Sequence, residues 1–194
     1  MKSTYDIILS AEETFAREAA LGLIVRRPVT TWHYLIPGMF IFDHLKRNGE
    51  IRRYTESFLA LRKIALSAAR AMIEGAPEEQ WRSRRREEIR LWLESLKLHS
   101  ANLQDALLKE ADVLTDHYKN LLTAEGELYA DLILHVYQDR DRYASFLRKL
   151  TGVEEEVNEA LKEKLGNTEA LMKRLSMESR VLEHMRERSA DTIF

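Results

Sequence analysis

The chain has 194 residues, of which 45% are hydrophobic, and it contains no cysteine. This length suits one domain with a sizeable core, and the missing cysteines exclude disulfides, thiolate zinc sites, iron–sulfur clusters and cysteine nucleophiles. The formal net charge of −2 argues against a dedicated nucleic-acid-binding protein, which usually carries a strongly basic domain or face.

The first helix is predicted over about residues 11–26. Ser10 and Glu13 have the spacing of a capping box, in which each side chain accepts a hydrogen bond from a free amide at the helix start. Pro28 follows, and a proline disfavours helical geometry in the residue before it. We therefore expect a short helix that ends at this proline.

Residues 30–42 form the least ordinary segment of the chain. They are its most apolar and aromatic stretch, and Pro37-Gly38 divides them by a turn or a helix break. A short helical piece is expected to follow and to end at Asn48-Gly49, because both residues tolerate the left-handed conformation that closes many helices.

A helix over residues 50–74 is predicted next. Gly75 stands just past its expected end, and Pro77 can occupy the first turn of the following helix, where a missing amide proton costs nothing. Such a short link predicts an antiparallel pair of helices.

Between Ile89 and Leu161 the apolar residues recur in alternating steps of three and four. Their mean spacing is close to the 3.5 residues that are typical of coiled-coil-like packing. An unbroken helix over 78–122 would be about 68 Å long, so we expect either an elongated molecule or a break. Breaks are predicted at residues 99–102, 123–126, 151–152 and 166–168, which leaves two last helices over about 153–165 and 169–188.

Together these patterns predict an all-α protein, an elongated antiparallel bundle of about five or six helices with coiled-coil-like seams. Residues 1–49 would hold the N-terminal helix and the apolar segment, 50–150 the main bundle, and 151–194 a C-terminal helical pair packed into the same domain. The N-terminus has an acid where a signal peptide is apolar, and no apolar run approaches the roughly 18 residues of a membrane span. A cytoplasmic location is therefore expected.

The apolar segment is the first candidate site. The six residues that we expect to make contact are Trp32, Tyr34, Leu35, Met39, Phe40 and Phe42. We interpret them as a docking element for a protein partner or a second copy of the chain, because aromatic anchors dominate such contacts. Two alternatives are that the segment belongs to the core, since large exposed apolar patches are rare, or that it contacts a membrane surface.

Polar residues on or near the predicted seam form the second candidate. Asp131, His135 and Asp139 stand four residues apart, so one helix would place an acid on either side of the imidazole ring. With His117 and Glu125 they could ligate a divalent metal. No histidine of the chain follows a glutamate by three residues, so the Glu-x-x-His motif of ferritin-like di-iron bundles is absent. Solvated ion pairs are the simpler interpretation, because such spacing is common on exposed helices.

A run of arginines is the third candidate. It comprises Arg82, Arg84, Arg85, Arg86 and Arg90. Glutamates alternate with these arginines, which favours a solvated, ion-paired helix face over a phosphate-binding stripe.

No catalytic constellation emerges from these residues. The sequence therefore predicts a non-enzymatic adaptor, scaffold or accessory subunit that acts through protein contacts and needs no cofactor. The alternative is a helical bundle that binds a metal ion or a small ligand.

Overall fold

The computed structural model describes residues 3–24 and 39–194, although the side chains of residues 39–48 lie outside that description. Within these ranges the chain forms seven α-helices and no strand, which confirms the all-α fold and exceeds the expected helix count. The helices are α1 (Thr4–Ile24), α2 (Met39–Ile73), α3 (Glu78–Ser95), α4 (Ala101–Leu122), α5 (Tyr129–Tyr137), α6 (Arg140–Leu165) and α7 (Glu169–Ile193).

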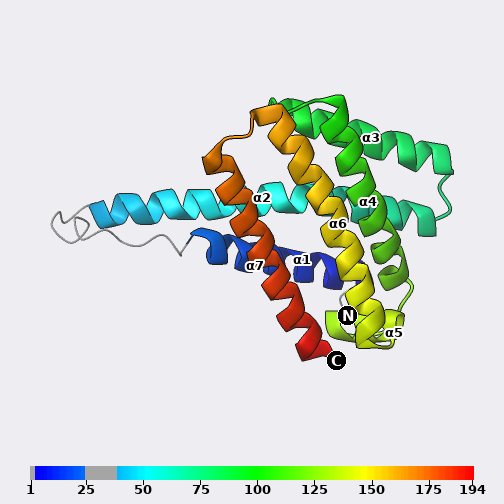
Figure 1. Cartoon of the computed structure of the whole chain (residues 1–194). Coiled ribbons are helices and arrows are strands. Elements are labelled where there is room, and N and C mark those ends of the chain that lie inside the picture. The colour runs from blue at the N-terminus through cyan, green and yellow to red at the C-terminus, as the bar shows by residue number, and fades with distance from the viewer. Residues whose placement is uncertain (1–2, 25–38) are drawn as a thin grey trace.

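The helices form two crossed sets. Figure 1 shows α1, α2 and α3 running in alternating directions, while α4, α6 and α7 cross them and also alternate in direction. The short α5 closes one end between α4 and α6. The expected antiparallel pairing of α2 with α3 is thus confirmed.

The core is shared by the whole described chain. Helix α4 lies at its centre and packs against α1, α2, α3, α5 and α6. The main cluster of buried apolar residues draws on every helix, for example Ile8 of α1, Leu66 of α2, Ile89 of α3, Leu132 of α5 and Ala190 of α7. Residues from the predicted parts 1–49, 50–150 and 151–194 therefore contribute to one core.

The start of α1 differs from its prediction. The helix begins at Thr4 because Ser3 and Asp6 form a capping box. The hydroxyl of Ser3 accepts a hydrogen bond from the amide of Asp6 at 3.2 Å, and the Asp6 carboxylate accepts one from the amide of Ser3 at 3.3 Å. The expected start at Ser10 was wrong, since that residue lies inside the helix.

Helix α2 is continuous where a helix end was expected. It runs from Met39 to Ile73 through Asn48-Gly49, so the predicted boundary there was wrong. The expected end at Gly75 is confirmed, because this glycine has a φ of 81°, in the left-handed region that closes helices.

The helix breaks after α3 and α4 fall close to their predicted places. Lys97 has a φ of 58°, and the hydroxyl of Ser100 caps the start of α4 at the amide of Leu103. The predicted break at Thr151-Gly152 was wrong, because α6 is continuous there. A break that was not expected lies at Gln138, with a φ of 64°.

The N-terminal part of α2 extends away from the body of the molecule (Figure 1). Among the α2 residues whose side chains are described, the first buried one is Leu59. The fifteen residues 39–53 correspond to about 22 Å of helix. We call them the α2 arm. Within the described ranges no helix is both long enough and apolar enough to cross a bilayer.

Candidate functional site

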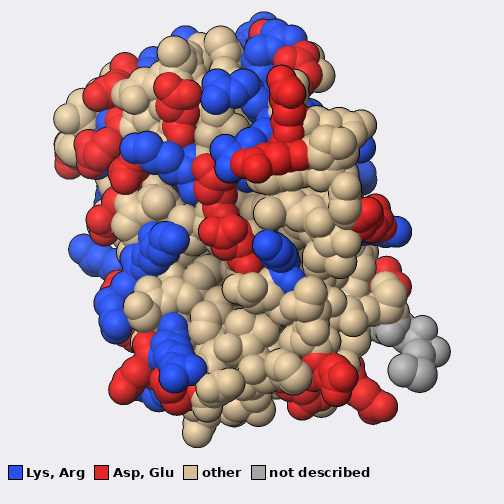
Figure 2. Space-filling model, turned by 90° about the vertical axis from the view of Figure 1, so that its right-hand side faces the viewer, with Lys and Arg blue, Asp and Glu red and all other residues tan. Residues whose placement is uncertain are grey.

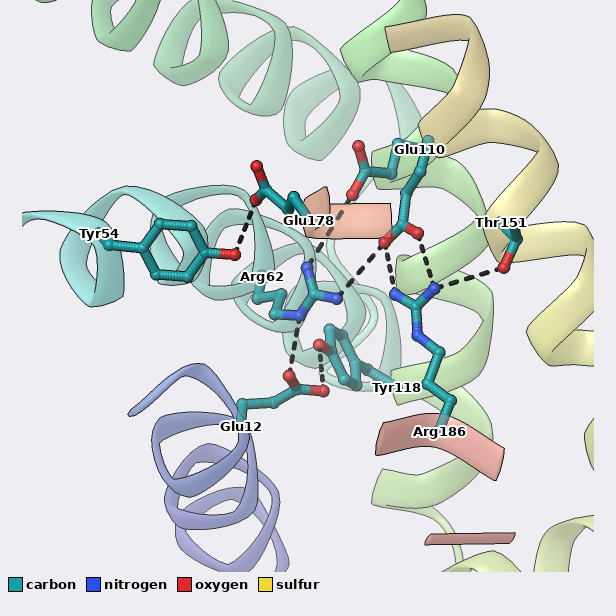
Figure 3. A network of polar contacts seen from close by, with 9 residues as sticks. Glu12, Tyr54, Arg62, Glu110, Tyr118, Thr151, Glu178 and Arg186 are labelled. Carbon is teal, nitrogen blue, oxygen red and sulfur yellow. Dashed lines mark hydrogen bonds and ion pairs between the residues drawn. The ribbon is translucent and has the colours of Figure 1, made fainter. Parts of the chain in front are cut away.

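A group of polar side chains occupies the interior of the molecule, between helices α1, α2, α4, α6 and α7 (Figure 3). We call it the charge cluster. Its members are the acids Glu12, Glu110, Glu154 and Glu178, the bases Arg62 and Arg186, and the hydroxyl residues Tyr54, Tyr118 and Thr151.

Arg62 of α2 joins three helices through its guanidinium group. Its side chain is only 5% exposed, and its Nε donates a hydrogen bond to Glu12 of α1 at 2.9 Å. Its Nη atoms lie 3.9 Å from Glu110 of α4 and 3.7 Å from Glu154 of α6. The guanidinium carbon also lies 3.9 Å from the ring centre of Phe58, one turn earlier. These contacts offset the cost of burying the charge.

Arg186 of α7 forms the second ion pair. Its two Nη atoms donate to the two carboxylate oxygens of Glu154 at 2.7 and 2.5 Å, a bidentate arrangement. Nη1 also lies within hydrogen-bonding distance of the Thr151 hydroxyl, at 3.4 Å. Glu154 therefore links Arg62 and Arg186, the two arginines of the charge cluster.

Two tyrosines complete the cluster. Tyr118 donates a hydrogen bond to Glu12 at 2.7 Å, and Tyr54 donates one to Glu178 at 2.7 Å. Burial raises the pKa of Glu178, and the Tyr54 bond acts against that rise. Burial and the nearby Glu178 carboxylate raise the pKa of Tyr54, so this phenol stays protonated and remains a donor.

Glu110 is the exception in the cluster. It is 6% exposed, and within the described part of the chain no donor forms a hydrogen bond with its carboxylate; its nearest cation is Arg62 at 3.9 Å. Burial, and secondarily the charge of Glu154, raise the pKa of Glu110 to about 7. Four carboxylates thus surround two guanidinium groups, and one of the four has no hydrogen-bonding partner.

A cavity of about 190 Å³ adjoins Glu110. This volume would hold about six water molecules at roughly 30 Å³ each. Its inner wall contains Arg62, Glu110 and Arg186, whereas the exposed residues Ser57 and Glu155 lie on its outer rim. Apolar side chains line the remainder, among them Phe58, Leu61, Trp92, Leu107, Leu175 and Leu182. The cavity therefore combines a charged inner end with apolar walls.

The structure does not bring the five predicted metal ligands together. His135 and Glu125 are exposed, and the Asp131 carboxylate caps α5 by accepting hydrogen bonds from the amides of residues 127 and 128. Asp139 caps α6, accepting from the amide of residue 142. The helix break at residue 138 ends the register on which the predicted spacing depended. Among the described side chains, those of residues 3–24 and 49–194, no group of three His, Asp or Glu residues could hold a metal ion.

His117 is the only one of those five that is buried. Its ring lies 2.6 Å from the hydroxyl of Tyr137 and 3.4 Å from that of Tyr129, and it stacks on Phe146 at 4.1 Å between ring centres. Burial lowers the pKa of His117 to about 3, with a further contribution from the charge of Arg62. It is therefore a neutral core residue near pH 7.

The side chains of the six predicted docking residues lie outside the described part of the structure. Trp32, Tyr34 and Leu35 lie outside the described residues. Met39, Phe40 and Phe42 belong to the first turn of α2, but their side chains lie outside the description as well. Their role stays a prediction.

The arginine run of α3 forms the expected ion-paired surface. Arg82 pairs with Glu78 at 2.7 Å and Arg84 with Glu88 at 2.8 Å, each one turn apart. Arg85 alone turns inward, where it pairs with Asp112. Figure 2 shows basic and acidic side chains interspersed over one face of the molecule.

Sequence reasoning singled out His117 but missed Arg62 and Arg186, the two arginines of the charge cluster. A signal for Arg62 does exist, because Phe58, Arg62 and Leu66 follow each other at steps of four on one face of α2. A charged residue on an apolar stripe indicates a buried ion pair. Identifying its partners requires the fold, because Glu12, Glu110 and Glu154 lie on three other helices.

Comparison with known proteins adds no assignment. The chain matches no family model, no curated protein and no solved structure.

Proposed function

We propose that the chain is a non-enzymatic helical adaptor or accessory subunit that docks a protein partner, or a second copy of itself, through residues 32–42. The observation that supports this proposal is the α2 arm, which extends from the body of the molecule (Figure 1). The apolar residues 32–38 directly precede the tip of this arm in the sequence. A segment attached there can reach a partner without unfolding the core.

The composition of the segment also supports docking. Trp and Tyr are enriched among the residues that dominate protein interfaces, because they bury a large area with few rotatable bonds. Trp32, Tyr34 and Phe40 supply such anchors within nine residues. Large apolar patches, where they are exposed, are uncommon on proteins that act alone.

The test replaces Trp32, Leu35 and Phe40 together by Gln. We expect the helical content and the melting temperature to be preserved, while self-association measured by light scattering, or recovery of a partner by affinity purification, is lost. The matched control replaces three exposed apolar residues elsewhere by Gln, namely Leu91, Leu165 and Met172, whose exposed fractions are 51%, 49% and 42%. This control should behave as the wild type.

An unchanged oligomer and an unchanged set of partners in the triple variant would contradict the proposal. Flotation with anionic vesicles tests the membrane alternative. If the wild type floats with the vesicles and the triple variant does not, the segment is a membrane anchor and not a protein-docking element.

A second candidate function, binding of a small ligand inside the bundle, is favoured by the cavity beside Glu110. The metal-binding form of that candidate lacks a ligand group among the described residues.

A further inference from the structure

We propose that the cavity beside Glu110 binds a small organic ammonium ion, with the ammonium group at the Glu110 carboxylate and its alkyl part against the apolar walls. This inference concerns the interior of the bundle and does not depend on the docking proposal.

The four acids of the charge cluster differ in the number of hydrogen bonds that they accept. Glu12 accepts hydrogen bonds from Arg62 and Tyr118, Glu154 accepts two from Arg186, and Glu178 accepts one from Tyr54. Glu110 accepts none within the described part of the chain, although it is more than nine-tenths buried. A largely buried carboxylate that accepts no hydrogen bond is costly, and an ammonium N–H supplies the missing donor together with a second cation beside Arg62.

The excess of acidic groups around the cavity determines the charge of the ligand. Arg186 donates to Glu154, and Arg62 donates through its Nε to Glu12, while the Nη atoms of Arg62 lie 3.9 and 3.7 Å from Glu110 and Glu154 (Figure 3). The positive charge of both arginines is therefore already paired with acids. Arg62 and Arg186 lie among four carboxylates, of which Glu178 also interacts with the charge of Arg174, and Glu155 adds a further acid at the outer rim. Three cations therefore stand against five acids. An approaching anion would be repelled, whereas a cation would be attracted.

The shape and lining select an organic cation. A metal ion requires several converging oxygen or nitrogen ligands, and no such group exists among the described residues. The walls instead offer Phe58, Trp92 and Leu107, which suit an alkyl chain, and the indole ring can also attract a positive charge. The volume of about 190 Å³ accommodates a short aliphatic amine.

Access comes from the outer rim of the cavity. Ser57 of α2 and Glu155 of α6 are exposed there, while Arg62, Glu110 and Arg186 at the inner end are buried. A ligand can therefore enter from solvent between α2 and α6 without a separation of helices.

Calorimetry and thermal unfolding with n-butylamine test the proposal at about pH 8. At this pH the amine is protonated and Glu110 is ionised, since burial raises its pKa only to about 7. We expect saturable binding and a rise in melting temperature of about 5–10 °C at one hundred times the Kd. 1-Butanol has the same butyl chain without a charge, and pentanoate has that chain with a negative charge; neither should bind.

Two variants locate the site. Glu110→Gln keeps the size of the side chain and removes its charge, and it should weaken butylamine binding at least tenfold. Ser57→Trp narrows the rim from an exposed position, and it should weaken binding while the melting temperature of the free protein stays near that of the wild type. The matched control Glu169→Gln, at an exposed acid on α7 that does not line the cavity, should bind as the wild type does.

Three results would each overturn the proposal. The first is no binding of butylamine at millimolar concentration. The second is equal binding of butylamine and 1-butanol, which would make the cavity purely apolar. The third is unchanged affinity in Glu110→Gln, which would put the amine elsewhere on the protein.

Discussion

Burial affects two titratable residues of this core in opposite ways. Glu110 is charged when deprotonated, so burial raises its pKa to about 7. His117 is charged when protonated, so burial lowers its pKa to about 3. Each shift has the same physical origin, the cost of removing a charge from water. The two side chains lie on α4 two turns apart, which places opposite pH responses close together.

Glu110→Gln should change how stability depends on pH. An unfolded glutamate titrates near pH 4.3, whereas the folded protein holds the Glu110 proton up to a pH of about 7. Between these values the unfolded state has released a proton that the folded state keeps. Through this residue, the free energy of unfolding of the wild type therefore falls by about 1.4 kcal/mol for each unit by which the pH rises. The variant has no titratable group at position 110, so this contribution is absent.

Urea unfolding of the wild type and the variant at several pH values between about 4.5 and 6.5 measures the effect. His117 contributes a slope of the opposite sign in this window, because its folded pKa lies below its unfolded value. It contributes to both proteins, so the difference between them isolates Glu110. As the pH rises, the free energy of unfolding of the variant should gain about 1.4 kcal/mol per pH unit relative to that of the wild type. A difference independent of pH would show that the fold does not raise the pKa of Glu110.

At the scale of the helix, two glycines test the assignments of α5 and α6. Gly152 lies inside α6 with no atom within 4 Å of an added Cβ, so Gly152→Ala should raise the free energy of unfolding by about 0.4–1 kcal/mol. Gly126 precedes α5, and its added Cβ would lie 2.6 Å from the Cβ of Asp131, the residue that caps α5. Gly126→Ala should therefore lower the free energy of unfolding by about 1–3 kcal/mol.

Denaturant unfolding of both variants checks these signs. A loss of stability in Gly152→Ala would indicate that the chain turns at Thr151-Gly152, as the sequence alone suggested. A neutral Gly126→Ala would mean that the loop before α5 can move away from Asp131.

The helix ends show how far the sequence could predict this fold. The number and type of the long helices follow from spacing, and the breaks near residues 97–100 and 123–128 follow from local residue types. The glycines at 49 and 152 misled the prediction because each stays helical at a cost of about 1 kcal/mol, which packing can outweigh. The break at Gln138 could not be foreseen, because a left-handed glutamine is uncommon.

The start of α1 could not be predicted for a different reason. Ser3–Asp6 and Ser10–Glu13 both resemble capping boxes in the sequence. What distinguishes them is the burial of Ile8, which is fully inaccessible and belongs to the core. Only the fold shows that this residue must already be helical.

At the scale of the whole molecule, the buried polar contacts join helices that are distant in sequence. Arg62 connects α1, α2, α4 and α6, and Arg186 adds α7 through Glu154. The apolar core has the same extent, since it includes residues of every helix. Helix α3 contributes no residue to the charge cluster and packs mainly against α2 and α4. It is the long helix whose unfolding would most readily separate from the rest.

We expect the described body to unfold as one cooperative unit all the same. Trp81 and Trp92 both lie on α3, and Trp81, Ile89 and Leu93 are buried there, so detaching α3 would expose several apolar side chains, each worth roughly 1.5–3 kcal/mol. Tryptophan fluorescence reports on α3, whereas far-UV circular dichroism reports on all helices. Measured in a Trp32→Gln background, which removes the remaining tryptophan, the two urea transitions should coincide. A urea midpoint that is lower by fluorescence than by circular dichroism would show that α3 unfolds first. The shared core would then not make the unfolding of α3 cooperative with that of the other helices.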